Sequence, residues 1–176
     1  MNGCIKTKMH ASNQTREQRI QEAEQKFEDG VELILREFLP AEIIVRRNVV
    51  IDGCRISFVV YRGDPDADIE PENCIAINCQ MVFTKDNWQN AIKIPYRFNY
   101  YFVATIPRKD HSGNIWVPNN NEIESVGVGT IIWLLGSEQD DEQIRQLSVR
   151  NHAVAYDFLQ PIDTIKYELL SDESDE

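Results

Sequence analysis

Basic and aromatic side chains gather in two stretches of the sequence and have the chemistry of a binding surface. Arg46, Arg47 and Arg55 stand close together in one stretch, and Arg97 and Tyr100 stand in a later, aromatic one. Guanidinium groups bind phosphates and carboxylates through paired hydrogen bonds, and Arg and Tyr are enriched among the residues that dominate protein interfaces. We therefore predict these five as binding residues, with ordinary ion pairing and packing of core aromatics as the alternative.

Carboxylates are numerous, but they form no recognisable catalytic motif. Glu28 and Glu32 lie at the edge of a helical apolar stripe, and Asp64 lies in an acidic loop at 63–73. Such groups are potential ligands of Mg²⁺, which prefers anionic oxygens, or they are simply solvated surface residues. The chain has no P-loop and no G-x-G-x-x-G motif. The carboxylates by themselves therefore predict no catalytic residue.

The cysteines and histidines do not indicate a metal centre either. The four cysteines include no C-x-x-C pair, and the three histidines are scattered along the chain. Cys74 and Cys79 are five positions apart in an apolar run, so a strand would direct them to opposite faces of a sheet. We predict reduced, mostly buried thiols, no metal site and no cofactor.

The elements that position these side chains follow from alternating helical and extended patterns. Thr15 and Gln18 can form a capping box before apolar residues spaced three and four apart, which predicts a helix that Pro40 ends. Asp52-Gly53 predicts a hairpin turn. The other predictions are hairpin strands at 42–51 and 55–61, a central strand at 74–83, a short helix near 88–92, strands at 99–106 and 126–135, a helix from 137 to before Pro161, and a short strand or ordered tail at 162–170.

This order of elements predicts a single α/β domain, built as a mixed β-sheet flanked by helices on both faces. The strand–helix–strand segment at 74–106 needs a crossover connection, so its two strands should be parallel. We expect the domain to span residues 14–170, after a mobile N-terminal arm at 1–13 and before an acidic tail at 171–176.

Length and charge restrict the class of protein. The 176 residues suit one domain, and 29 acidic against 18 basic residues give a net charge of −11. That charge opposes broad contact with nucleic acid, although a local basic strip remains an alternative. No apolar run approaches the ~20 residues of a membrane span, and the N-terminus has no signal-peptide pattern. We expect a cytoplasmic protein without a membrane partner.

The order and spacing of the elements resemble the PD-(D/E)XK restriction-endonuclease-like fold, in particular its small repair nucleases of the MmcB kind. The hairpin strand reads Gly53-Cys54-Arg55-Ile56-Ser57 where that family has Gly-Arg-x-x-Asp, and the central strand reads Asn78-Cys79-Gln80 where it has Glu-x-Lys. The stretches at 95–104 and 126–131 resemble the family's aromatic strand and the strand after it. The resemblance covers about residues 17–160 and rests on layout.

The resemblance implies a nuclease fold without its metal site. In that family the Asp and Glu hold Mg²⁺ and the Lys assists the attacking water. Ser57, Asn78 and Gln80 are neutral, so they bind Mg²⁺ only weakly. We expect these three side chains to converge in one shallow pocket at the strand ends. Mg²⁺ would be needed only if relocated ligands, such as Glu28 and Glu32, have taken over.

These observations together predict a non-catalytic binding or regulatory protein with a nuclease fold. The resemblance implies a nucleic-acid-related setting, such as defence, repair or a mobile element. We expect the protein to act mainly through a protein partner. Two alternatives remain open. One is a metal-dependent DNA endonuclease with relocated ligands, and the other is an acidic inhibitor or immunity protein whose −11 net charge imitates nucleic acid.

Overall fold

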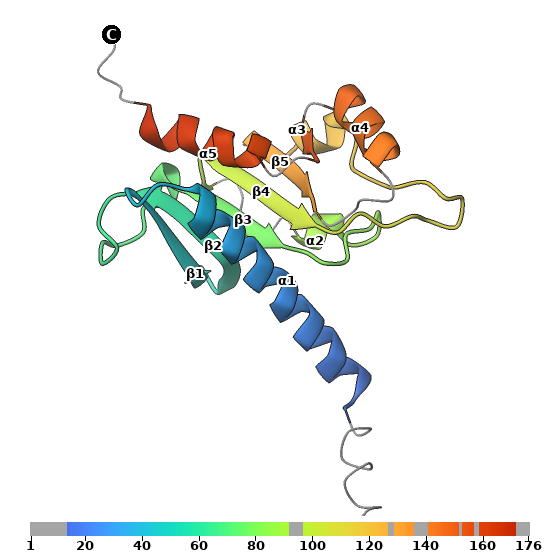
Figure 1. Cartoon of the computed structure of the whole chain (residues 1–176), viewed down its shortest axis with the longest axis horizontal. Helices are drawn as coiled ribbons and strands as arrows, with labels where there is room; N and C mark the ends of the chain where they lie inside the picture. The colour runs from blue at the N-terminus through green and yellow to red at the C-terminus, as the bar shows by residue number, and fades with distance from the viewer. Residues whose placement is uncertain are drawn as a thin grey trace, which may run out of the picture.

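A computed structural model of the chain describes residues 14–91, 97–126, 129–135, 141–151, 153–156 and 159–171. They form a six-stranded sheet with helices on both faces, as the order of elements predicts (Figure 1). The predicted arm at 1–13 and residues 172–176 of the predicted tail lie outside the described residues. The elements are α1 (Arg16–Phe38), β1 (Ile43–Ile51), β2 (Cys54–Arg62), η1 (Pro71–Asn73), β3 (Ile75–Cys79), α2 (Trp88–Ala91), β4 (Tyr100–Thr105), α3 (Asn120–Glu124), β5 (Gly129–Leu134), α4 (Asp141–Arg150), β6 (Val154–Ala155) and α5 (Leu159–Leu170).

The strands lie in the sheet in chain order, from β1 at one edge to β6 at the other. β1, β2 and β3 are antiparallel neighbours, whereas β3 to β6 are parallel. The predicted parallel pair is confirmed, because Ile75 of β3 pairs with Tyr100 of β4. The hairpin turn is also as predicted: Asp52 and Gly53 have φ of 51° and 77°, the left-handed conformation of a two-residue turn.

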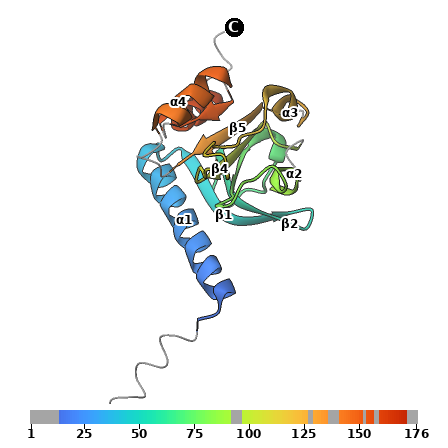
Figure 2. The same cartoon turned by 90° about the vertical axis from the view of Figure 1, so that its right-hand side faces the viewer.

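Two apolar layers pack against the two faces of the sheet (Figure 2). α1 and α5 cover one face, which we call the α1 face, through residues such as Leu35 and Ile165. α2, α3 and α4 cover the other face, the α2 face, through residues such as Trp88, Ile123 and Ile144. Cys74 packs on the α2 face and Cys79 on the α1 face, so their predicted opposite orientation is confirmed.

The helix α1 begins with the predicted capping box, in which the Thr15 side chain accepts from the Gln18 N–H and the Gln18 side chain accepts from the Thr15 N–H. Its N-terminal half extends beyond the sheet (Figures 1 and 2). Ile20, part of the predicted apolar stripe, is 42% exposed there. The sheet therefore covers only the C-terminal half of the stripe, where Glu28, Val31 and Leu35 are buried.

The C-terminal part of the chain differs from the sequence prediction. The predicted helix from 137 to before Pro161 is confirmed at 141–150 as α4 but is wrong beyond Arg150, because Val154 pairs with Ile132 in the sheet. A second helix, α5, then covers 159–170 and replaces the short strand or ordered tail predicted at 162–170. Pro161 is tolerated because it lies in the first turn of α5, where its missing N–H has no helical partner to lose. The buried β6 strand is too short to interrupt a helical apolar pattern in the sequence.

The central strand β3 is also shorter than predicted. It ends at Cys79, and Gln80 follows it, with its backbone N–H donating to the Ala104 carbonyl at 2.8 Å. The apolar run continues to Phe83 because that side chain packs into the α2-face layer from the following loop. Among the described residues, no helix has both the length and the apolar character that crossing a membrane requires.

Candidate functional site

A reversal in the β1–β2 hairpin decides where its arginines point. In a regular strand, alternate residues share a face, yet Ile56 packs on the α2 face and Phe58 on the α1 face. The reversal coincides with Asn48, which has a φ of 58° and lies between Arg47, paired with Phe58, and Val49, paired with Ile56. Asn tolerates this left-handed conformation better than most residues. Because of the reversal, the side chains of β1 and β2 change faces halfway along the hairpin.

The consequence is that Arg47 and Arg55, on either side of the reversal, both reach the same carboxylate of α1. Glu28 Oε1 accepts from Arg47 Nε at 3.3 Å and from Arg55 Nη2 at 2.6 Å. Glu28 is only 6% exposed, so its charge is balanced by these guanidiniums rather than by solvent. We call the group the arginine–carboxylate cluster; its members are Glu28, Asp29, Glu32, Arg47 and Arg55.

Arg47 is the centre of this cluster. Its Nη1 donates to Asp29 at 2.6 Å and to Glu32 at 2.7 Å, in addition to the bond with Glu28. The hydrogen bond from Arg47 is the main reason that the pKa of Glu32 is lowered; burial opposes it and Arg36 reinforces it. The pKa of Arg47 is raised, chiefly by its hydrogen bonds with Asp29 and Glu32. Glu32 and Arg47 therefore remain charged at neutral pH.

Arg55 forms the exposed side of the cluster. Its side chain is 54% exposed, and its Nε donates to Asn48 Oδ1 at 2.6 Å. A shallow pocket of about 340 Å³ opens here, lined mainly by polar and charged residues of α1 and the hairpin. Its lining residues are Gln21, Glu24, Gln25, Glu28, Arg47, Asn48 and Arg55. Such a surface offers hydrogen bonds and charge to a polar partner.

Two of the predicted degenerate-site residues join neighbouring strands. Asn78 Oδ1 accepts from the Ser57 N–H at 3.0 Å, and Asn78 Nδ2 donates to the Tyr101 hydroxyl at 2.6 Å. Ser57 Oγ accepts from the Cys79 N–H at 3.1 Å. Burial raises the pKa of Tyr101, a shift that the bond with Asn78 opposes. The structure brings Ser57 and Asn78 together, whereas Gln80 lies beyond the end of β3.

The position of Asn78 separates it from Glu28. Cys79, the next residue, packs on the α1 face, so the side chain of Asn78 lies on the α2 face with Tyr101. Burial raises the pKa of the Cys79 thiol to about 12, and the charge of Glu28 adds to that shift. The Cys79 thiol, and not the Asn78 amide, is therefore the β3 side chain near Glu28.

The residues at this site do not fit the Mg²⁺ that the family resemblance implies. Mg²⁺ requires several hard oxygen ligands in near-octahedral geometry, and Ser57 and Asn78 use their oxygens in hydrogen bonds between strands. Glu28 is bound by two guanidiniums. Within the described parts of the chain, no group of three or more His, Cys, Asp or Glu could hold a metal ion.

The other predicted binding residues lie apart from the cluster. Arg97 is ion-paired with Asp52 in the hairpin turn. Arg46 Nη1 donates to the Ala67 carbonyl at 3.2 Å, in the loop after β2. Tyr100 packs edge-on against Phe102, with ring centroids 6.5 Å apart, and its ring covers Gly129 so closely that a Cβ there would clash. The predicted residues therefore form several separate contacts.

Sequence reasoning missed Asn48, Asp29 and Tyr101 as parts of this region. Asn48 offered one signal, because an Asn within a β-branched segment is compatible with a left-handed residue that interrupts a strand. The other two offered none, since Asp29 resembles the other acids of α1 and Tyr101 resembles a core aromatic. Their roles depend on which strands become neighbours.

We predict that Asn78→Ala lowers the free energy of unfolding by about 2 kcal/mol, because it removes the acceptor of the Ser57 N–H and the hydrogen bond that Asn78 Nδ2 donates to the Tyr101 hydroxyl. Urea denaturation at pH 7 measures the change. A loss below about 0.5 kcal/mol for Asn78→Ala would contradict this role.

Comparison with known proteins returns no match: no protein-family model, curated protein or solved structure matches this chain. The fold and the cluster define a single-domain mixed α/β protein with a charged pocket between its first helix and its first hairpin. Function is therefore argued from that geometry.

Proposed function

We propose that this protein is a non-catalytic binding or regulatory protein with a nuclease-like fold, acting mainly through a protein partner. The observation that carries the proposal is the pairing of Arg47 and Arg55 with the buried carboxylate of Glu28. A metal-dependent nuclease needs carboxylates that are free to bind the metal ion. Here the carboxylate of Glu28 is bound by two guanidinium groups instead. The nucleic-acid-related setting rests on the resemblance of the sequence alone.

The state of the arginines favours a protein partner over a nucleic acid. Arg47, Arg55 and Arg97 are each paired with a carboxylate, so phosphate groups would have to displace those partners. The net charge of −11 adds long-range repulsion. A protein can instead bind the exposed mixture of Arg55, Asn48 and the α1 acids through direct hydrogen bonds, as protein interfaces commonly do.

The two alternatives make different demands on the same residues. A nuclease with relocated ligands would need Glu28 to exchange its guanidinium partners for a metal ion. An acidic inhibitor would use the exposed carboxylates of α1, such as Glu24, and would bind a basic partner protein. The second alternative is compatible with a protein-binding role, and the first is not.

A nuclease and binding assay on the full chain tests the proposal. We expect no cleavage of single- or double-stranded DNA with Mg²⁺ or Mn²⁺, and little DNA binding at physiological salt. A phosphate track of about four contacts would instead give a log–log salt slope near roughly −3.6 on duplex DNA. Metal-dependent cleavage that disappears in Glu28→Gln would establish the nuclease alternative. Asp64→Ala tests the second candidate metal ligand in the same way.

The protein-binding role has its own readout. Capture of host proteins by the wild-type chain should weaken with Arg55→Ala, because Arg55 is the half-exposed cation of the cluster. Arg108→Ala is the matched control, since Arg108 is exposed and far along the chain from the cluster. Tight, salt-sensitive DNA binding that Arg55→Ala abolishes, with no protein captured, would contradict the preference for a protein partner.

A further inference from the structure

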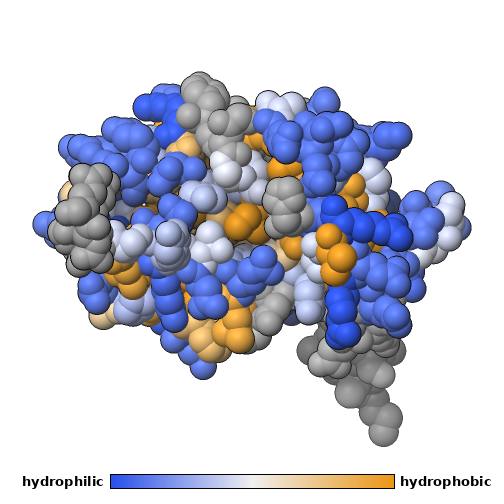
Figure 3. Space-filling model, turned by 90° about the horizontal axis from the view of Figure 1, so that it is seen from above, coloured by the Kyte–Doolittle hydropathy of each residue, from blue (hydrophilic) through white to orange (hydrophobic). Residues whose placement is uncertain are grey.

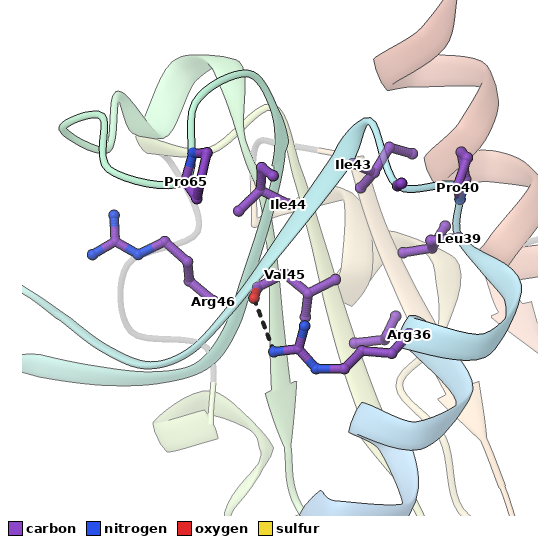
Figure 4. A pocket seen from close by; sticks show the side chains of 10 residues that line it. Arg36, Leu39, Pro40, Ile43, Ile44, Val45, Arg46 and Pro65 are labelled. Carbon is purple, nitrogen blue, oxygen red and sulfur yellow. Dashed lines mark hydrogen bonds between the residues drawn. The ribbon is translucent and has the colours of Figure 1, made fainter.

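A second pocket, distinct from the cluster, lies on the outer edge of the sheet. Its volume is about 370 Å³, and four consecutive residues of β1 line it (Figure 4). Successive residues of a strand point to opposite faces, so a pocket lined by four in a row must be centred on the edge itself. The lining residues are Leu35, Arg36, Leu39, Pro40, Ala41, Ile43, Ile44, Val45, Arg46 and Pro65.

The pocket has a wall on each side of the β1 edge. Leu39, at the C-terminal end of α1, forms one wall together with Ile43 and Val45 (Figure 4). Pro65, from the loop after β2, lies on the other side near Ile44 and Arg46. An extended segment lying along β1 would therefore contact Leu39, Ile43 and Arg36 on one side, and Ile44, Pro65 and Arg46 on the other.

The edge strand has backbone groups to offer. β1 pairs with β2 alone, and an edge strand presents a row of N–H and C=O groups that no neighbouring strand binds. Two of its groups already bond outside the sheet: the Ile43 N–H donates to the Pro40 carbonyl at 3.0 Å, and the Val45 oxygen accepts from Arg36 Nη2 at 3.2 Å (Figure 4). Addition of a strand at such an edge is a recurrent mode of peptide recognition.

The charge of the pocket is opposite to that of the chain. The net charge is −11, yet the lining contains two arginines and no carboxylate. Arg36 is paired with Glu32 at 3.0 Å. Within the described residues Arg46 makes no ion pair, and its Nη1 donates a hydrogen bond to the Ala67 carbonyl. Arg46 therefore has donors left for an acidic side chain.

On the face seen in Figure 3, which includes α5, apolar side chains lie in small patches divided by hydrophilic ones. Exposed apolar residues such as Tyr167 and Val149 belong to helices whose backbone groups are already paired internally. The β1 edge combines apolar side chains, an arginine that makes no ion pair among the described residues, and backbone groups that no second strand binds.

We infer that the β1 edge is the docking site for an extended acidic segment of a partner protein, which adds to the sheet as a further strand. Its apolar residues lie against Leu39 and Ile43, and the alternate acidic residues lie near Arg46. The inference rests on the proposed binding role and specifies the chemistry of the partner. It uses residues outside the arginine–carboxylate cluster, so the two can be tested separately.

The test uses the full chain and a labelled short peptide in which valine and glutamate alternate. We expect binding by fluorescence anisotropy, and slower hydrogen exchange of the β1 amides at 43–51 when the peptide is present. Arg46→Glu should weaken binding about tenfold or more, as loss of a charge pair and addition of repulsion require. Arg46→Gln should weaken it less, and Arg108→Glu, which makes the same charge change elsewhere, should leave it unchanged.

Two further peptides and two properties of the chain complete the design. A valine–lysine peptide, or the valine–glutamate peptide with alternate amides N-methylated, should not bind. Equal binding of either would overturn the inference, as would peptide binding that leaves the exchange of the β1 amides unchanged.

Faster exchange of those amides after removal of residues 172–176 would identify the chain's own tail as occupant. Dimerisation that Arg46→Glu abolishes would identify a second copy. Both results overturn the inference, and neither affects the nuclease assay.

Discussion

Ser57→Asp is expected to lower the free energy of unfolding at pH 7 by about 4 kcal/mol relative to Ser57→Asn. Ser57 is 2% exposed, so an aspartate there brings a charge into the interior. The neighbouring Cys79 thiol reports on this environment: burial is the largest cause of its raised pKa, and the Glu28 charge is the next. The comparison with asparagine isolates the charge, because the two side chains have nearly the same size.

The pH dependence of this loss has a definite sign. Burial raises the pKa of the new carboxyl above its ordinary value of about 3.9. The folded state then holds the proton more tightly than the unfolded state, so the penalty is absent at low pH. The penalty grows as pH rises through about 3.9 and reaches its full size above the folded-state pKa. Urea denaturation of both variants, in steps of about one pH unit between about pH 3 and about pH 7, measures this difference in the free energy of unfolding.

Mg²⁺ makes the same variant a test of function. If the position of Ser57 were a latent metal site, millimolar Mg²⁺ would bind the new carboxylate and restore most of the lost stability. We expect no recovery, because the nearby Asn78 faces away from Glu28 and the Glu28 carboxylate is bound by arginines. Recovery by Mg²⁺, together with DNA cleavage, would favour the nuclease alternative over the proposed binding role.

Arg47→Met should lower the free energy of unfolding by about 3 kcal/mol at pH 7. Methionine keeps much of the volume, but Asp29 and Glu32 lose their shared guanidinium and Glu28 loses one of its two. Three carboxylates then lie close together with only Arg55 on Glu28 and Arg36 on Glu32 to balance them. The burial of Glu28 makes this loss larger than that of a surface ion pair.

The difference between wild type and Arg47→Met should diminish in acid. Arg47 lowers the folded-state pKa of Glu32 below its ordinary 4.5, so the pairing contributes stability above that pH, and the contribution is lost as pH falls through the lowered value. Arg108→Met is the matched control: Arg108 is exposed and outside the cluster, so its replacement should cost at most about 0.5 kcal/mol. Equal losses for both variants at pH 7 would contradict the central role of Arg47.

The local elements were predictable because their signals are contained in short stretches of chain. The capping box of Thr15 and Gln18, the helical stripe before Pro40 and the Asp52-Gly53 turn act between residues a few positions apart. The mixed sheet and the parallel β3–β4 pair also followed, since a strand–helix–strand segment leaves one common connection. Their confirmation reflects short-range hydrogen bonding and the geometry of connections.

The break between α4 and α5 was not predictable for the opposite reason. Val154 leaves the helical pattern only because Ile132, far back in the chain, offers it a place beside β5. Apolar side chains at helical spacing look the same whether they cover a sheet or form its edge strand. The choice depends on the free energy of pairing with a distant strand, which no local pattern contains.

The sequence by itself determined which residues carry charge, that a helix, a hairpin and a buried strand follow one another, and that the positions of Ser57 and Asn78 are neutral. Only the tertiary structure decided what those residues do. One left-handed residue, Asn48, reverses the faces of the hairpin, and this places Arg47 and Arg55 on the same carboxylate of α1. Because side chains alternate with a period of two, a change at one residue redirects every later one, and its outcome depends on the helix that packs above.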